Sequence, residues 1–205
     1  MADGFGKYDV YASAGSNYCY RGTNLLINRL AIRDPDQLRR IETDLTAIRQ
    51  QAMLSSPIKG RFSAHHLRAI HRFLFGDIYP FAGHYRREDI MKGSTRFLHH
   101  AEIPANLTKL LAELRAENVL ENLDYAKMVE RSAYYFAELN YIHPFREGNG
   151  RTIREFMRLL LLRNGYEVDW GRVDPDALLA LMEQSVYDAR VLEAPLKACL
   201  RPLDE

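Results

Sequence analysis

Signals that start a helix recur along most of this chain, and apolar residues at helical spacing follow them. Asp34 can cap a helix whose first residue is Pro35, and Gln37 then completes a capping box. The apolar residues that follow are Leu38, Ile41, Leu45 and Ile48. Spacings of three and four residues place them on one face of a helix.

The same combination of signals predicts further helices. Their expected starts are Ser63, Pro104, Asp124, the turn before Ile153, and Asp174. Gly76 and Gly165 are expected to end two of them. A last helix is predicted over about 186–200, where Pro195 can kink or split it. The chain is therefore predicted to be mainly α-helical.

One domain is expected to cover residues 1–205, because 47% of the residues are hydrophobic and can form a substantial core. We expect an irregular N-terminal extension over about 1–33, a core over about 60–165 and C-terminal helices over about 174–200. The extension is rich in tyrosine, at Tyr8, Tyr11, Tyr18 and Tyr20. These rings either pack the extension onto the body or lie on its surface.

One segment interrupts the helical pattern. The runs 85–91 and 95–98 flank Lys92-Gly93-Ser94, and two β-capable runs around a glycine turn predict a hairpin. The hairpin would present an exposed strand edge, which can bind an extended peptide. From the hairpin pattern alone, a simple connection between two helices is the favoured interpretation.

Charge and cysteine content exclude several classes of function. The net charge is +1, from 28 basic and 27 acidic residues, whereas a general nucleic-acid surface needs a basic excess, so direct nucleic-acid binding is not expected. Cys19 and Cys199 are too few for a disulfide framework or a zinc site. No signal sequence or membrane span is recognisable, so we expect a cytosolic protein without membrane attachment.

The segment after the Asp124 helix contains the residue types of a phosphate site. Gly148-Asn149-Gly150 tolerates unusual backbone angles and precedes a helix start, where N–H groups are unpaired and the dipole is positive. Such helix ends bind phosphate oxygens. Arg151 and Arg154 lie three residues apart, so both can face the same anion.

Two further side chains complete this pattern. The Glu147 carboxylate would repel a nucleotide unless a divalent cation lay between them, which indicates Mg²⁺. His143 precedes the phosphate site and can act as a general base. Each residue alone has an ordinary explanation, such as a turn or a solvated helix face. Together they are better explained by one nucleotide ligand.

The fixed positions of the pattern H-x-F-x-[D/E]-G-N-G-R-x-x-R, the signature of the Fic family, are all satisfied by residues 143–154. Phe81-Ala82-Gly83 and the hairpin around Lys92-Gly93 also resemble segments of Fic proteins. Residues 20–45 resemble the N-terminal part of short bacterial Fic toxins. The resemblance implies the Fic fold, a helical bundle with a β-hairpin flap over the active-site loop.

The resemblance also implies protein adenylyltransferase activity, the transfer of AMP from ATP to a hydroxyl side chain of another protein. It implies that His143 is the base, that Phe145 anchors the loop and that Glu147 holds Mg²⁺. The implied nucleotide-binding residues are Gly148, Asn149, Gly150, Arg151 and Arg154. The implied target-docking flap comprises Ile90, Met91, Lys92, Gly93, Ser94, Thr95, Arg96 and Phe97, with Ile90 and Met91 as candidates for clamping the modified side chain.

Many Fic proteins carry an inhibitory helix with the pattern [S/T]-x-x-x-E-[G/N], whose glutamate pairs with the second signature arginine. No Ser or Thr of this chain has Glu four residues later. The resemblance therefore implies a class I toxin, regulated by a small separate antitoxin whose glutamate engages Arg154. The implied site of action is the bacterial cytoplasm, and the implied targets are the DNA gyrase B subunit and topoisomerase IV.

Two other interpretations stay open. Fic relatives can transfer phosphate or phosphocholine or remove AMP, and the loop could bind nucleotide without catalysis. Two pairs of neighbouring histidines, His65-His66 and His99-His100, could bind metal, but adjacent helical residues point in different directions, which favours surface histidines. Tyr187 and Asp188 are candidates for adenosine contacts or for plain helix packing.

Overall fold

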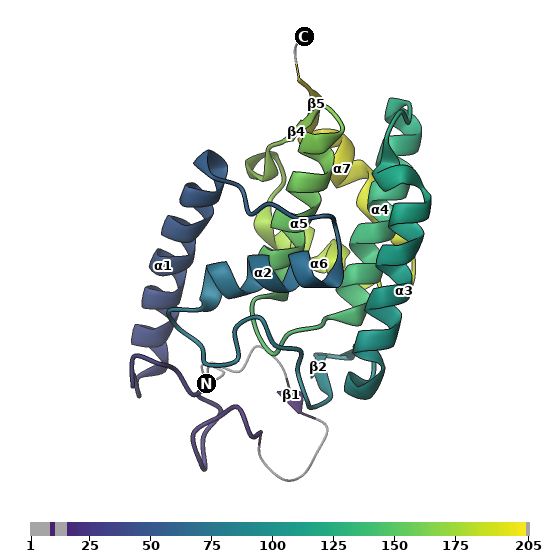
Figure 1. The fold of residues 1–205 in the computed structure, drawn as a ribbon. Helices are drawn as coiled ribbons and strands as arrows, with labels where there is room; N and C mark the ends of the chain where they lie inside the picture. Colours follow the sequence, from purple (N-terminus) through teal and green to yellow (C-terminus); the bar gives the residue numbers. More distant parts are fainter. Residues whose placement is uncertain (1–8, 11–15, 204–205) are drawn as a thin grey trace.

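The computed structural model describes residues 9–10 and 16–203 and is mainly helical (Figure 1). The α-helices are α1 (Pro35–Ser55), α2 (Ala64–Phe75), α3 (Ile103–Ala116), α4 (Tyr125–Ile142), α5 (Asn149–Arg163), α6 (Pro175–Gln184) and α7 (Glu193–Cys199). Short 3-10 turns are η1 (His100–Glu102), η2 (Asn118–Leu120), η3 (Trp170–Arg172) and η4 (Ala189–Leu192). The strands are β1 (Asp9–Val10), β2 (Ile90–Lys92), β3 (Thr95–Arg96), β4 (Tyr166–Val168) and β5 (Leu200–Pro202).

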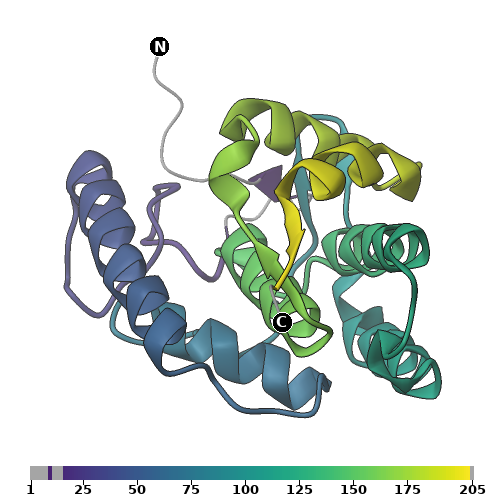
Figure 2. The same ribbon diagram turned by 90° about the horizontal axis from the view of Figure 1, so that it is seen from above.

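Helices α4 and α5 pack against each other at the centre of the bundle. Helix α3 packs on α4, whereas α2 packs on α5 and α1 on α2, so α1 and α3 lie on opposite sides of the central pair (Figure 1 and Figure 2). The β2–β3 hairpin lies at one end of the bundle and the β4–β5 pair at the other (Figure 1). This arrangement places the loop between α4 and α5 beside the hairpin.

The predicted caps are present where the helices begin. The Asp34 carboxylate accepts the N–H of Gln37 at 2.6 Å, and Asp124 accepts that of Lys127 at 2.8 Å. Ser63 and Asp174 cap α2 and α6 in the same way. These bonds satisfy N–H groups that have no partner within the helix. The prediction of a mainly helical chain is confirmed.

The buried face of α1 differs from the predicted apolar stripe. Its buried residues are Leu38, Glu42, Thr46 and Met53. Ile48, which was expected on the core side, is 65% exposed. The face is rotated because two polar side chains, Glu42 and Thr46, turn inward toward an arginine of α5.

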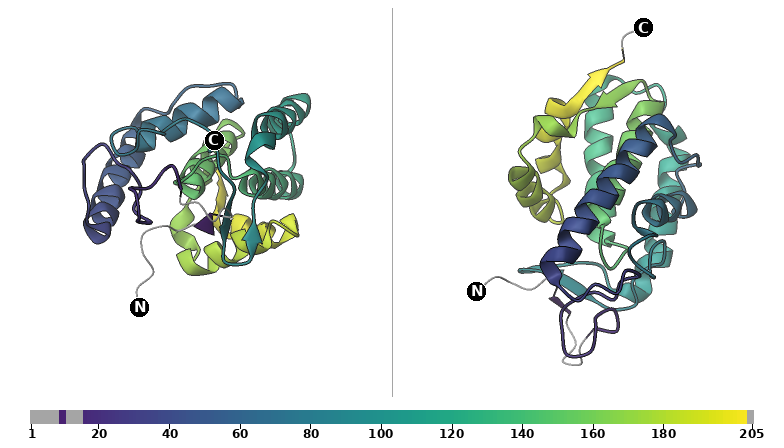
Figure 3. Two further views of the ribbon diagram at one scale, coloured as in Figure 1. Left: turned by 90° about the horizontal axis from the view of Figure 1, so that it is seen from below. Right: turned by 90° about the vertical axis from the view of Figure 1, so that its left-hand side faces the viewer.

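The hairpin forms around Gly93, whose φ of +55° suits a tight turn, but its strands are shorter than predicted. Residues 85–89 are not strand, because Arg86 and Asp89 are engaged in other contacts described below. The expectation of an exposed edge is wrong for β2, since β1 pairs with it antiparallel, with Val10 opposite Ile90 (Figure 3).

The C-terminal part also departs from the prediction. The expected helix over about 186–200 is reduced to η4 and α7, and the chain then forms β5 against β4. Pro195 lies in the first turn of α7, where a missing N–H leaves no helix bond unmade. The proline therefore defines the start of a short helix and does not kink a long one.

The N-terminal extension packs onto the body through Tyr18. Tyr18 makes an edge-to-face contact with Phe81 at 5.2 Å between centroids and accepts the Arg87 N–H, whereas Tyr20 lies under Arg33 inside the extension itself. Tyr8 and Tyr11 lie outside the described residues. No described helix is both long and apolar enough to span a membrane.

Candidate active site

The loop between α4 and α5 is held in shape by its own side chains. The amide of Asn149 bonds both ends of residue 145, accepting its N–H at 2.8 Å and donating to its carbonyl at 2.7 Å. Phe145 is fully buried, as expected for an anchor. Asn149 is itself fully buried, so its amide holds the shape of the loop.

Gly148 allows the loop to pass close to α2. Its φ is +78°, and a Cβ atom there would lie 2.3 Å from ring carbons of Phe75. Its own N–H donates to Glu147 Oε1 at 2.9 Å. Glycine is therefore favoured at this position both by the backbone conformation and by the close packing against Phe75.

Replacement of Gly148 by alanine is expected to destabilise the fold by about 3 kcal/mol, from backbone strain plus overpacking against Phe75. Chemical denaturation measures the change. Gly22→Ala is a matched control, because Gly22 has a φ of +76° but nothing within 4 Å of its Cβ position. Equal losses in the two variants would show that the contact with Phe75 contributes nothing.

His143 ends α4 in the left-handed conformation, with φ 45° and ψ 61°. Its Nδ1 lies 2.9 Å from the Asn140 carbonyl oxygen, which can only accept, so Nδ1 carries the proton and Nε2 is the basic nitrogen. The ring stacks on Phe97 of the hairpin, with centroids 3.7 Å apart. Burial, helped by the charges of Arg86 and Lys92, lowers the pKa of His143 to about 3, although the bond to Asn140 opposes this.

Arg86 ties the hairpin to the end of α4 from a buried position. Its Nε donates to the His143 carbonyl at 2.9 Å, and its Nη2 donates to the Leu98 and Ile142 carbonyls. The C-terminal carbonyls of a helix favour a cation. Arg86 thus fixes the backbone of His143 relative to the hairpin.

His71 connects two segments around the same loop. Its Nδ1 accepts the N–H of Gly83 at 2.7 Å, so the proton is on Nε2, 2.9 Å from the Glu147 carbonyl. The ring stacks on Phe145 with centroids 3.8 Å apart. Burial lowers the pKa of His71 to about 3. His71 is therefore a neutral positioning residue.

Two buried neutral histidines make stability depend on pH. The pKa values of His71 and His143 are about 3 in the fold, whereas an unfolded histidine titrates near its ordinary value of 6.5. Between these values the unfolded chain binds more protons, so the unfolding free energy falls as pH falls, by about 1.4 kcal/mol per pH unit for each histidine. Denaturant titrations should show the slope growing toward this value as the pH falls from about 7 to about 5. In His143→Asn this slope should be smaller by the contribution of one histidine. An unchanged slope would contradict the assignment of His143 as a buried neutral group.

Arg151 is engaged from α1. Its Nη2 pairs with Glu42 and its Nη1 donates to Thr46 Oγ1 at 3.0 Å, while Glu147 Oε1 lies 3.8 Å away. Burial lowers the pKa of Arg151, but the charges of Glu42 and Glu147 outweigh it and raise the pKa. A guanidinium has five N–H donors, so others remain for a ligand.

Arg154 is in the opposite situation. It is half-buried and has no hydrogen-bond acceptor or acidic partner among the residues that the structure describes. Burial and the nearby charge of Arg151 lower its pKa. The guanidinium lies against Gly150, in the first turn of α5, where the N–H groups lack carbonyl partners. An unpaired cation at a helix N-terminus is a site for an anion.

A cavity of about 540 Å³ opens beside these groups. One wall is formed by His143, Gly150 and Arg154, and another by Lys92 and Phe97 of the hairpin. The remaining wall is mostly apolar and comes from the C-terminal part: Trp170, Val173, Leu178, Leu179 and Met182. This size and this combination of apolar walls with few polar groups suit a small molecule.

The cavity wall contains a buried donor without a partner, the indole Nε1 of Trp170. Across the mouth, Lys92 Nζ lies 3.0 Å from Glu183 Oε1, so the hairpin and α6 are joined by an ion pair. A buried N–H without a partner is destabilising, but this atom is almost inaccessible, so it is other atoms of Trp170 that face the cavity.

The structure brings only part of the predicted site onto this cavity. His143, Gly150 and Arg154 line it, whereas Glu147 and Arg151 lie beside it with Glu42. In the hairpin, Ile90, Thr95 and Phe97 are buried, Met91 and Lys92 are half-buried, and Gly93, Ser94 and Arg96 are exposed. Ile90 is 0% exposed, which is incompatible with a clamp on a target side chain in this state.

Sequence reasoning missed several residues of the site. These residues are Glu42, His71, Arg86 and Trp170. Conversely, Tyr187, a sequence candidate for adenosine contacts, is 78% exposed and does not line the cavity. Trp170 could have been noticed as the single tryptophan. Nothing in the local pattern around Glu42 reveals that it faces Arg151.

The comparisons with known proteins agree with this geometry. The Fic/DOC family model matches residues 61–161. Protein adenylyltransferase VbhT of Bartonella schoenbuchensis is 37% identical over 177 residues, which are 86% of this chain and 37% of that protein. The probable protein adenylyltransferase Fic of Escherichia coli is 36% identical over 169 residues, covering 82% of this chain and 84% of that protein. This chain belongs to the Fic/DOC family.

The Fic fold is also found among solved structures. The N-terminal Fic domain of a putative cell filamentation protein from Bartonella quintana, with bound ADP, is 26% identical and has a TM-score of 0.85. The match covers 92% of this chain and 96% of that one. The expected Fic fold, with its hairpin flap at the active-site loop, is confirmed.

Proposed function

We propose that this Fic-family adenylyltransferase transfers AMP from ATP to a hydroxyl side chain of another protein. The observation that carries the proposal is Arg154, which has no acidic partner in the part of the chain that the structure describes and shares a cavity with His143 at the N-terminus of α5. A base and an anion site on one cavity suit the attack of a hydroxyl on a phosphate. Relatives named protein adenylyltransferase, at 36 and 37% identity, support the same reaction.

In the proposed reaction, His143 Nε2 takes the proton of the target hydroxyl. The hydroxyl oxygen then forms a bond to the α-phosphorus of ATP, and the bond from that phosphorus to the bridging oxygen breaks. Pyrophosphate leaves with the negative charge. In this proposal the N–H groups of the first turn of α5 and the guanidiniums of Arg151 and Arg154 stabilise this charge.

Mg²⁺ fits the residues beside the phosphate site. Glu147 offers a carboxylate oxygen next to the start of α5, and one carboxylate with phosphate oxygens and waters is a common Mg²⁺ arrangement. When bound, Mg²⁺ would neutralise charge on the phosphates. Gly148 N–H already orients Oε1 of Glu147.

The apolar wall is the proposed adenosine site. Trp170, Leu178 and Met182 line it and can pack against the adenine ring. The flap is the proposed docking site for the target segment. Its described partner on the β2 edge is β1, so a target strand must either displace β1 or pair with β3.

The lack of an acidic partner for Arg154 among the described residues supports external regulation. We propose that a small antitoxin supplies a glutamate to Arg154, that the protein acts as a toxin in a bacterial cytoplasm, and that the DNA gyrase B subunit or topoisomerase IV is its target. Co-expression with the antitoxin should restore growth. Restoration that still depended on the antitoxin glutamate in an Arg154→Ala enzyme would contradict the assigned contact.

The test of the proposed function is incubation of the purified chain with ATP, Mg²⁺ and a bacterial lysate, followed by peptide mass spectrometry. An AMP-sized increment on a Ser, Thr or Tyr hydroxyl, absent with the His143 variant, supports the proposal. A phosphate or phosphocholine increment, or no modification, refutes it.

A further inference from the structure

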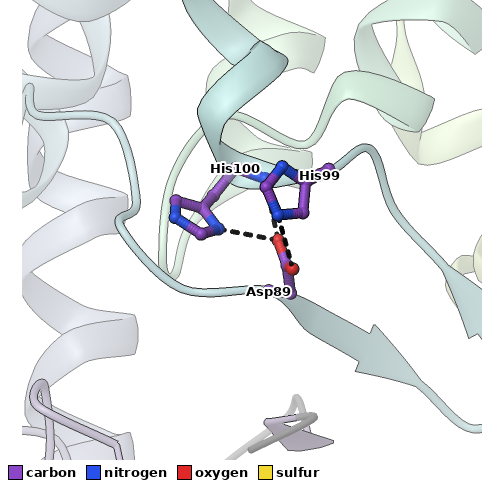
Figure 4. A group of neighbouring side chains, drawn as sticks. All are labelled: Asp89, His99 and His100. Carbon is purple, nitrogen blue, oxygen red and sulfur yellow. Dashed lines mark hydrogen bonds and ion pairs between the residues drawn. The ribbon is translucent and has the colours of Figure 1, made fainter.

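A second group of metal-ligating side chains lies at the base of the flap, away from the nucleotide cavity. Asp89 directly precedes β2, and His99 and His100 follow β3, so the two ends of the hairpin meet here (Figure 4). One ligand atom from each residue lies within 4.8 Å of the others. None of the three lines the nucleotide cavity.

The two histidines converge because they are not both helical. His99 has φ −57° and ψ 132°, an extended conformation, and His100 begins η1. This geometry overrides the expectation that adjacent histidines point apart, which holds for residues within one helix. Figure 4 shows both rings directed at the same carboxylate.

The distances are close to those of a metal site. His99 Nε2 lies 3.3 Å from Asp89 Oδ2, and His100 Nδ1 lies 2.9 Å from Asp89 Oδ1. Donors on a tetrahedral Zn²⁺ ion are separated by about 3.4 Å, given bond lengths of about 2.0–2.2 Å. Small movements of the exposed His99 and the partly buried His100 side chains would therefore admit an ion.

The carboxylate is already oriented by its surroundings. Asp89 Oδ1 accepts the His100 backbone N–H at 2.8 Å, and Arg86 Nη1 lies 3.6 Å from the same oxygen. Oδ2 is the oxygen that faces His99. A metal can thus use Oδ2 while Oδ1 keeps the His100 backbone N–H and Arg86, and the contact between His100 Nδ1 and Oδ1 is exchanged for the bond to the metal. The His99 side chain is 53% exposed, which leaves an approach for the ion and room for a water ligand.

We propose that Asp89, His99 and His100 form a site for a divalent transition metal of the Zn²⁺ type, separate from the Mg²⁺ proposed at Glu147. Two imidazoles and one carboxylate favour Zn²⁺, Co²⁺ or Ni²⁺, whereas Mg²⁺ prefers oxygen donors. The bound metal joins the residue before β2 to the residues after β3. It therefore braces the base of the flap.

The experiment is calorimetric titration of Zn²⁺ into the tag-free, full-length chain, with Co²⁺ visible absorption as an independent readout of nitrogen and oxygen ligation. One site is expected. Zn²⁺ binding should weaken at least about tenfold in each of two variants, His99→Ala and Asp89→Asn. His99→Ala disturbs the fold least, and Asp89→Asn keeps an acceptor for the His100 N–H. His65→Ala is the matched control, since His65 is also an exposed histidine with a histidine neighbour.

Zn²⁺ should also raise the melting temperature of the wild type and of His65→Ala, and not of His99→Ala. No Zn²⁺ binding by the wild type, or equal affinity in the wild type and His99→Ala, would overturn the proposal. Equal affinity in Asp89→Asn would overturn the assignment of the carboxylate as a ligand. These readouts do not depend on AMP transfer.

Discussion

Replacement of His143 by asparagine is expected to reduce AMP transfer by about 10²- to 10⁴-fold, the usual contribution of a general base. Asparagine is the most informative substitution at this position. It tolerates the left-handed backbone found here, and its amide N–H can keep the bond to the Asn140 carbonyl. It has no basic nitrogen, so the variant removes the proposed chemistry and keeps the local geometry.

Binding of ATP should change little in this variant, because the phosphate contacts come from α5. Equilibrium binding of a fluorescent ATP analogue and the rate of transfer should be measured on the same preparation. Loss of rate with retained affinity supports the role as base. Full activity of His143→Asn would contradict it, and loss of ATP binding would assign His143 to nucleotide binding instead.

Replacement of Glu42 by alanine is expected to destabilise the fold by about 3–5 kcal/mol, the cost of removing one partner of a buried ion pair. The Glu42 and Arg151 side chains are 4% and 16% exposed, and Glu42 also accepts the Tyr79 hydroxyl. Burial and the charge of Glu42 raise the pKa of Tyr79, so this hydroxyl stays protonated as a donor. The melting temperature should fall by roughly 10 °C.

Glu42→Gln, which keeps hydrogen-bond acceptors, should lose less stability, and Asp44→Ala, an exposed acidic residue on the same helix, should lose almost none. If Glu42 positions Arg151 for the phosphates, Glu42→Gln should also weaken ATP binding at temperatures where it is folded. Unchanged stability and unchanged ATP affinity in Glu42→Ala would show that Glu42 neither stabilises the fold nor positions Arg151.

Helix boundaries could be predicted from the sequence because their causes are local. Asp34, Ser63 and Asp124 cap the residues that immediately follow them, and Gly148 and Arg154 belong to one continuous segment. A site confined to one loop and one helix start can be read from consecutive residues. His143, the glycine turn and Arg154 could therefore be proposed as site residues from the sequence.

The remaining contacts depend on tertiary packing. Glu42 meets Arg151 across 109 residues, and His71 meets the Glu147 carbonyl across 76. No periodicity in either segment indicates such a partner, and the polar face of α1 conflicts with the apolar stripe that was predicted. The pairing of β1 with β2 and the convergence of His99 with His100 likewise depend on where the chain passes in the fold.

The central claim is that the chain transfers the α-phosphate of ATP, as AMP, to a protein hydroxyl. It is tested most directly with two samples of ATP, one radiolabelled at the α-phosphate and one at the γ-phosphate, incubated with the enzyme and its target. The account predicts label on the target from the α-labelled ATP only, and no label with His143→Asn. Label on the target from γ-labelled ATP would contradict it, because that label should leave in pyrophosphate.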